Sequence, residues 1–294
     1  MDLRAHPLTV RGHDGLVLRA DSWGADGAPP VLLLHGGGQT RHAWRATAQR
    51  LAVSGYRAVT ADLRGHGDSE WAAGGDYRLD AFALDLVALA AALPSPPAVV
   101  GASLGGLSAL LAEGEIAPGT TSAVVLVDVG PRLEPEGVAR ILGFMTANPD
   151  GFASLEDAAD AIAAYLPHRP RPTDLGGLAK NLRLGADGRY RWHWDPAFLD
   201  GPRRAGSSHT PDRLLAASRA LRVPTLLVRG RESDTLSEEA AREFLELVPH
   251  ARYADVAGAR HMVAGDRNDV FASAVIGFLD EVVGAESVDD EATS

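Results

Sequence analysis

Val99-Val100-Gly101-Ala102-Ser103-Leu104-Gly105-Gly106-Leu107 is the stretch that decides how the rest of the chain is interpreted. An apolar β-branched run predicts the end of a buried strand, and a helix-forming run, 104–113, follows with almost no loop. The serine between them must lie on a sharp, strained turn, which is tolerable only where neighbouring backbones approach closely. Gly101 and Gly105 lack a Cβ and leave that room. We therefore expect Ser103 Oγ above a sheet, at a helix N-terminus that favours negative charge.

The five-residue match to G-x-S-x-G is weak evidence by itself. The strand expected before it and the helix expected after it make the match much more specific. The alternative is a glycine-rich junction at which Ser103 merely caps the helix. The other motifs along the chain favour the first interpretation.

The composition is that of an ordinary globular protein. The 294 residues are 46% hydrophobic and 23% charged, enough for one large α/β domain with an insertion or for two modest domains. No apolar run approaches the roughly 18 residues of a membrane span, and the N-terminus lacks the apolar core of a signal peptide. Cysteine is absent, so neither disulfides nor thiolate metal sites are expected, and the expected compartment is the cytoplasm. The formal net charge of −11 disfavours nucleic acid and anionic membranes as partners.

Strands and helices are expected to alternate over most of the chain. An opening hairpin is predicted within residues 8–23. Apolar runs then predict strands at 31–34, 56–61, 98–100, 122–127, 223–228 and 253–256. Helical patterns lie at 42–53, 79–93, 104–113, 238–247 and 268–279. This rhythm predicts a mostly parallel sheet built from right-handed crossovers and flanked by helices.

The rhythm changes between residues 131 and 220. This stretch has several helical patterns, a weakly helical run at 173–184, a period-two run at 189–194 and no strongly apolar strand. It predicts a mainly helical cap, 131–220, inserted between two core segments, 1–130 and 221–284. Residues 285–294 are acidic and are expected to form a disordered tail.

A serine hydroxyl needs a base to become a nucleophile, and His261 is the best candidate. His261 follows the last expected strand and precedes the last helix, so it lies at the same sheet edge as Ser103. The alternative is an ordinary surface-loop histidine. A carboxylate must hold the imidazole, and Asp234, after the preceding strand, is the leading candidate. Asp128 and, after it, Glu232 remain alternatives, and any of these acids could instead cap a turn.

Attack on an acyl carbon creates an oxyanion, which requires hydrogen-bond donors already in place. The Leu104 N–H is one expected donor because of its place at the helix start. The loop 35–38, His-Gly-Gly-Gly, should supply the other, because absent side chains let backbone approach the substrate. Gly37 is the favoured residue and Gly38 the second choice. His35 is expected to be structural, bonded to the neighbouring loop backbone.

These features resemble the α/β-hydrolase superfamily over about residues 8–280. The resemblance rests on the order Ser103, Asp234, His261, on the HG loop, on D-x-R-G-x-G-x-S at 62–69, and on the cap position. The three glycines 36–38 and the helical cap are similar to the branch of serine esterases, lactonases, C–C bond hydrolases and cofactor-free haloperoxidase-like proteins. The resemblance implies acyl-enzyme hydrolysis without metal or cofactor. Haloalkane dehalogenases and epoxide hydrolases carry aspartate at the nucleophile position, and Ser103 speaks against both.

The expected function is therefore a serine hydrolase acting on a small carboxylic ester or lactone, as a monomer or homodimer. The cap would close over the acyl pocket, with Gly38 and Trp192 contacting the substrate. For Trp192 the alternative is packing within the cap core. Competing hypotheses are hydrolysis of a C–C bond in a β-diketone-like substrate, cofactor-free oxygenation, and non-catalytic ligand binding.

Overall fold

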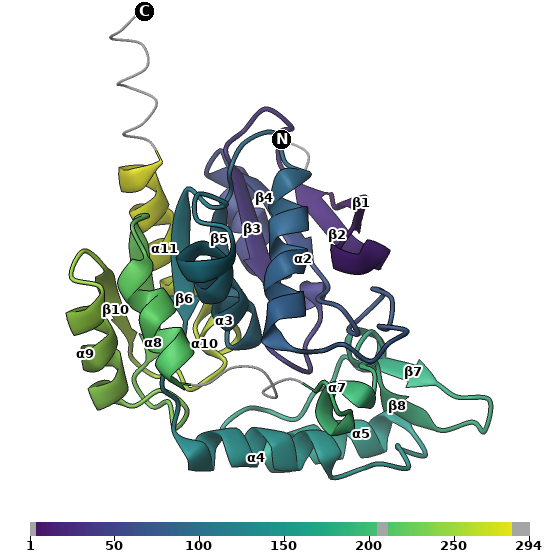
Figure 1. The fold of residues 1–294 in the computed structure, drawn as a ribbon. Coiled ribbons are helices and arrows are strands. Elements are labelled where there is room, and N and C mark those ends of the chain that lie inside the picture. Colours follow the sequence, from purple (N-terminus) through teal and green to yellow (C-terminus); the bar gives the residue numbers. More distant parts are fainter. Residues whose placement is uncertain (1–3, 205–210, 284–294) are drawn as a thin grey trace, which may run out of the picture.

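A mostly parallel, eight-stranded sheet runs through the computed structural model, which describes residues 4–204 and 211–283 (Figure 1). The strand order is β1-β2-β4-β3-β5-β6-β9-β10. The bounds are β1 His6–Arg11, β2 Val17–Trp23, β3 Pro30–Leu34, β4 Arg57–Ala61, β5 Ala98–Ala102, β6 Ala123–Val127, β9 Thr225–Gly230 and β10 Arg252–Val256. Only the β1–β2 and β2–β4 pairs in this sheet are antiparallel. The fold class expected from the sequence is confirmed.

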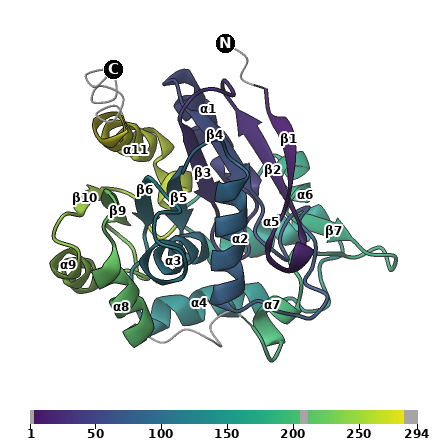
Figure 2. The same ribbon diagram turned by 45° about the horizontal axis from the view of Figure 1, so that its top comes forward.

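Helices cover both faces of this sheet (Figure 2). The core helices are α1 Arg45–Val53, α2 Leu79–Ala91, α3 Leu104–Leu111, α9 Glu238–Leu247, α10 Val263–Asp266 and α11 Asn268–Val282. Short helical turns lie at η1 His13–Gly15, η2 Arg41–Trp44 and η3 Ala112–Ile116. Alternate side chains of each inner strand face opposite layers: Leu32 and Leu34 join the cluster under α2, α3 and α9. Val31 and Leu33 join the cluster under α1 and α11, which is why these strands are apolar throughout.

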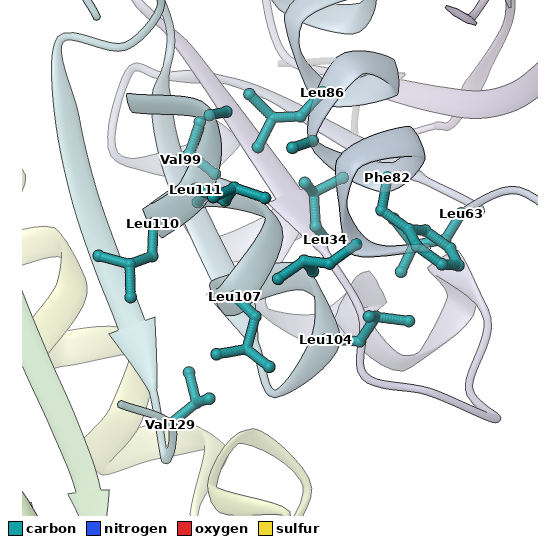
Figure 3. Close-up of a cluster of buried hydrophobic side chains, with 14 of the residues drawn as sticks. Leu34, Leu63, Phe82, Leu86, Val99, Leu104, Leu107, Leu110, Leu111 and Val129 are labelled. Carbon is teal, nitrogen blue, oxygen red and sulfur yellow. The ribbon is translucent and has the colours of Figure 1, made fainter. Parts of the chain in front are cut away.

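The start of α3 packs against a cluster of buried apolar side chains (Figure 3). Leu104 and Leu107 of α3 belong to the same buried cluster as Leu34 of β3, Phe82 of α2 and Val129. Dense packing leaves this helix terminus little freedom to shift. The turn between β5 and α3 is thereby held in place.

A separate group of elements lies along one edge of the sheet (Figure 1). It contains α4 Pro135–Thr146, α5 Leu155–Tyr165, α6 Leu175–Ala179, β7 Leu182–Leu184, β8 Tyr190–Trp192 and α7 Ala197–Asp200. β7 and β8 pair as a small antiparallel sheet. The period-two run at 189–194 indeed contains a strand. The weakly helical interpretation of 173–184 is wrong at its end, where Leu182–Leu184 is held extended by pairing with β8.

The last helix assigned to the cap does not lie there. α8, Pro211–Ala220, is placed beside α3 and α9 on the face of the sheet, and its Leu214 and Ala217 join the core cluster of α3 (Figure 1). The predicted cap boundary at residue 220 is therefore too late, because α8 buries its apolar side against the core. The expected tail, 285–294, lies outside the described residues. Within the described ranges no helix is both long and apolar enough to cross a membrane.

Candidate active site

Ser103 occupies the strained turn that its flanking glycines predict. It sits between β5 and α3 with φ 46° and ψ −113°, a conformation that non-glycine residues rarely adopt. A Cβ on Gly101 would lie 2.5 Å from the Gly106 nitrogen. A Cβ on Gly105 would lie 2.5 Å from the Leu34 carbonyl oxygen. Neither position can carry a side chain without moving the backbone, so both glycines are required by the turn.

His261 makes a direct contact with Asp128. The ring Nδ1 of His261 lies 2.8 Å from Asp128 Oδ2, and the carboxylate is fully buried. The Gly230 N–H donates to Asp128 Oδ1 at 2.9 Å, and the Ser233 hydroxyl donates to Asp128 Oδ2 at 2.5 Å. Because every group facing the carboxylate is a donor, Nδ1 of His261 carries its proton toward Asp128. Nε2 is then left with a lone pair, and no described residue hydrogen bonds to it.

Strand register brings Asp128 beside Ser103. Ala102 at the end of β5 pairs with Val127 at the end of β6, so Ser103 and Asp128 follow neighbouring strands. Neighbouring strands lie about 4.8 Å apart. The Ser103 N–H donates to the Val127 carbonyl at 3.3 Å, which fixes the two turns to each other. Asp128, like Ser103, has a positive φ, 50°. The hydroxyl and the carboxylate that holds His261 thus belong to one sheet edge.

The prediction of Asp234 as the partner of His261 is wrong. Asp234 forms an ion pair with Arg140 of α4 and also accepts a hydrogen bond from the Thr235 hydroxyl at 3.4 Å. A Cβ on Gly137 of α4 would lie 2.2 Å from the Asp234 carbonyl oxygen, so the cap helix packs directly on this loop. The physical reason is that the loop after β9 folds toward α4, which leaves the carboxylate after β6 facing the imidazole. Glu232, the remaining alternative, pairs with Arg260 instead of His261: its Oε2 lies 3.8 Å from Arg260 Nε.

The glycine loop presents one unoccupied N–H group. The Gly36 N–H donates to Gln39 Oε1 at 3.0 Å, and the Gly38 N–H donates to His66 Nε2 at 3.1 Å. Neither the Gly37 N–H nor the Leu104 N–H hydrogen bonds to any residue in the part of the chain that the structure describes. A Cβ on Gly36 would lie 3.3 Å from Ser103 Cβ, so the loop passes next to the serine. By elimination, Gly37 is the loop residue free to donate to an oxyanion.

Three buried histidines, His35, His66 and His193, contact the backbone of this loop. His35 Nδ1 donates to the Gly36 carbonyl at 2.8 Å while its Nε2 accepts the Leu63 N–H at 3.0 Å, so the expected structural role of His35 agrees with its contacts. The ring centroids of His35 and His66 are 5.3 Å apart, and those of His66 and His193 are 5.7 Å apart. Burial lowers the pKa of His35 to about 4, that of His66 to about 3 and that of His193 to about 2. All three therefore remain neutral near pH 7.

Cap side chains close directly on the two glycines. The Phe198 ring lies 3.2 Å from the position of a Cβ on Gly37, and Met145 Cε lies 2.8 Å from one on Gly38. Trp194 Cζ3 lies 3.3 Å from the position of the same Cβ on Gly38. All three side chains are buried, so the wall beside the loop is apolar. Sequence reasoning missed Met145 and Phe198 because nothing in the cap's periodicity marks a contact with the glycine loop.

Trp192 packs within the cap. It stacks on Trp194 with ring centroids 5.2 Å apart and planes 12° from parallel. Its ring centroid also lies 5.5 Å from that of Phe144 and 5.2 Å from that of Phe152. These contacts correspond to the core-packing alternative for Trp192. A substrate contact by Trp192 remains a prediction.

The D-x-R-G-x-G-x-S segment supports the site without entering the chemistry. Buried Asp62 accepts the Arg41 N–H at 2.7 Å and the Asp68 N–H at 2.9 Å, and it pairs with the Arg41 guanidinium. Buried Arg64 makes two hydrogen bonds to the Asp85 carboxylate, at 2.7 and 2.8 Å. These ion pairs fix the loop that carries His66. Within the described ranges, no group of three or more His, Asp or Glu side chains is arranged to hold a metal ion.

Comparison with known proteins now identifies the family. The family model for the alpha/beta hydrolase fold matches residues 29–267. The chain belongs to the α/β-hydrolase family. An esterase of Mycobacterium tuberculosis is 32% identical over 266 residues, covering 88% of this chain and 85% of the relative. A 3-hydroxybutyrate-oligomer hydrolase of Cupriavidus necator is 28% identical over 256 residues, covering 81% of this chain and 85% of the relative.

Solved structures agree with this assignment. A structure of a Mycobacterium tuberculosis esterase superposes with a TM-score of 0.75 at 29% identity, covering 94% of this chain and 92% of that one. The structure of E-2-(acetamidomethylene)succinate hydrolase superposes with a TM-score of 0.83 at 23% identity, covering 94% of this chain and all of that one, and supports the fold alone. This α/β-hydrolase family member is an enzyme, and its relatives are named as esterases and hydrolases.

Proposed function

We propose that the protein is a serine hydrolase that cleaves a small carboxylic ester or lactone through an acyl-enzyme on Ser103. The observation that carries this proposal is the pairing of His261 with the buried Asp128 at the sheet edge where the strained turn presents Ser103. Backbone strain and buried ionisable pairs both concentrate at functional sites. Their occurrence at the same sheet edge therefore supports a catalytic role.

Each step of the reaction has a candidate group. Nε2 of His261 takes the Ser103 proton as Oγ attacks the acyl carbon, and Asp128 stabilises the imidazolium. The N–H groups of Gly37 and Leu104 receive the developing oxyanion, helped by the N-terminus of α3. His261 then returns the proton to the departing alcohol. Water activated by the same imidazole releases the acid and restores Ser103.

The cap supports a small, largely apolar substrate. Phe198, Met145 and Trp194 already fill the space beside Gly37 and Gly38. A bulky acyl or alcohol group would have to displace these buried side chains, whereas a short one requires less rearrangement. Among p-nitrophenyl esters, acetate and butyrate are therefore expected to exceed longer chains in kcat/KM.

The test is a panel of p-nitrophenyl esters of increasing acyl length, short lactones and a β-diketone, assayed with wild type and Ser103→Ala. Hydrolysis of short esters or lactones by wild type, reduced to background in Ser103→Ala, supports the proposal. Turnover of the β-diketone alone would reassign the enzyme to C–C bond hydrolysis. Ester turnover that Ser103→Ala retains would refute the proposed nucleophile.

A further inference from the structure

The Ser233 hydroxyl is aimed at the carboxylate that holds His261. Ser233 Oγ accepts the Thr235 N–H at 3.1 Å and the Leu236 N–H at 3.2 Å. With both lone pairs occupied, its single proton is directed to Asp128 Oδ2, 2.5 Å away. The same Oδ2 receives Nδ1–H of His261. One carboxylate oxygen is thus shared by a hydroxyl and the imidazole.

We propose that Ser233 is a positioning residue that lowers the basicity of His261 by sharing the Asp128 oxygen. Its importance for turnover rests on the proposed function, whereas its effect on the His261 titration does not. The loop after β9 thus contributes Ser233 to the site, whereas its sequence suggested Asp234. Asp234 pairs with Arg140 of the cap, and Ser233 donates a hydrogen bond to Asp128, which follows β6.

The direction of the effect follows from the charge on Asp128. A hydrogen bond from Ser233 spreads the negative charge of Oδ2, so that oxygen attracts an imidazolium less strongly. Neutral His261 is the form that can accept a proton, and weaker attraction of the imidazolium favours that form. The hydroxyl also fixes where Oδ2 lies, and with it the direction in which Nε2 points. Removing the hydroxyl should raise the pKa of His261 and loosen its orientation.

Other charged groups near His261 do not change in such an experiment. Arg169 of the cap contacts the Met262 carbonyl at 3.2 Å and pairs with Asp266, and Asp266 accepts the Arg260 N–H at 2.9 Å. Further charged or titratable groups around this loop and the loop after β9 are His168, Glu232, Asp234, Arg140, Arg231, Asp255 and Arg267. Because none of them contacts Ser233 Oγ, their influence cancels between wild type and variant.

The experiment compares Ser233→Ala with Ser233→Thr, which retains the hydroxyl, and with Ser237→Ala as matched control. Ser237 is a nearby loop serine that caps α9 through the Ala240 N–H at 3.2 Å. The His261 imidazole is titrated by NMR, its signal assigned by its loss in His261→Gln. Ser233→Ala should raise the titration midpoint by about half a pH unit or more. Ser233→Thr and Ser237→Ala should stay near the wild-type midpoint.

Kinetics provide the second readout. In Ser233→Ala the acidic limb of the kcat/KM profile should move to higher pH together with the NMR midpoint, and kcat should fall about tenfold with KM little changed. If Ser233→Ala does not fold, Ser233→Cys, whose thiol is a weaker donor, replaces it with the same expected direction.

Three results would overturn the proposal. They are an unchanged or lowered midpoint in Ser233→Ala, an equal shift in Ser237→Ala, and a Ser233→Thr midpoint that moves as far as that of Ser233→Ala. A wild-type protein without hydrolase activity would instead refute the proposed function, because the NMR titration is read without turnover. The two failures are therefore distinguishable.

Discussion

Replacing Asp128 by asparagine should disable the enzyme while leaving the site nearly the same shape. The carboxylate accepts from three donors: the Gly230 N–H, the Ser233 hydroxyl and Nδ1–H of His261. An amide NH₂ placed at Oδ2 would face two donors, the Ser233 hydroxyl and Nδ1–H of His261. An amide NH₂ placed at Oδ1 would instead face the Gly230 N–H, whose nitrogen lies 2.9 Å from Oδ1 and cannot become an acceptor. The first arrangement reverses the imidazole tautomer and puts a proton on Nε2, where the base is needed.

The size of the loss follows from the tautomer. A wrong tautomer at such an acid typically lowers kcat by about 10³- to 10⁴-fold, equivalent to about 4 to 5.5 kcal/mol of transition-state stabilisation. Asp234→Asn is the matched control, because its ion pair with Arg140 is partly exposed and such pairs contribute about 1 kcal/mol or less. We expect kcat/KM of Asp234→Asn within about threefold of wild type.

Both variants are assayed with a short p-nitrophenyl ester at saturating and subsaturating concentrations. Circular dichroism and melting temperature establish that each protein is folded. The reverse order, with Asp234→Asn inactive and Asp128→Asn active, would refute the assignment of the acid and return that role to Asp234.

Three further outcomes follow from the packing around the site. Gly38→Ala should lower kcat about tenfold or more in the ester assay, because φ is +77° and the new Cβ meets cap side chains; unchanged kcat would contradict this. With folded-state pKa values of about 3 for His66 and about 2 for His193, the unfolded chain binds more protons below pH 6.5. The free energy of unfolding from urea titrations should therefore fall as pH drops from about 6.5 to 4.5, by up to about 1.4 kcal/mol per pH unit per histidine, and His193→Gln should flatten that slope. Asp85→Ala removes the buried carboxylate that makes two hydrogen bonds to the Arg64 guanidinium and should reduce the free energy of unfolding by about 3 to 5 kcal/mol in urea titrations, and a loss below about 1 kcal/mol would contradict a buried pair.

Local sequence signals were enough to predict the sheet and the strained turn that carries Ser103. Apolar runs mark β3, β5, β6 and β9 because these strands are buried on both faces, and the Gly101–Gly105 spacing marks a turn that no other residues fit. The unoccupied N–H of Gly37 also agrees with the sequence-based choice within its loop.

The identity of the acid could not be decided from the sequence. Asp128 and Asp234 both follow strands that end at the same sheet edge, so strand order allows either one. The choice depends on how the loop after β9 folds, and that depends on long-range contacts with Arg140 and Gly137 of the cap. No local pattern encodes such contacts.

The cap boundary failed for a similar reason. α8 has an amphipathic pattern that would suit either the cap or the core, and only its packing beside α3 and α9 assigns it to the core. The β7–β8 pair is too short to produce a recognisable apolar run, since each strand is three residues long.

Covalent labelling distinguishes a nucleophilic Ser103 from a serine that only caps α3. A fluorophosphonate probe, followed by digestion and mass spectrometry, should place one adduct on the peptide containing Ser103. The adduct should be lost in Ser103→Ala and greatly slowed in His261→Gln and Asp128→Asn. Undiminished labelling of Ser103→Ala, or an adduct on another residue of the wild type, would contradict the account.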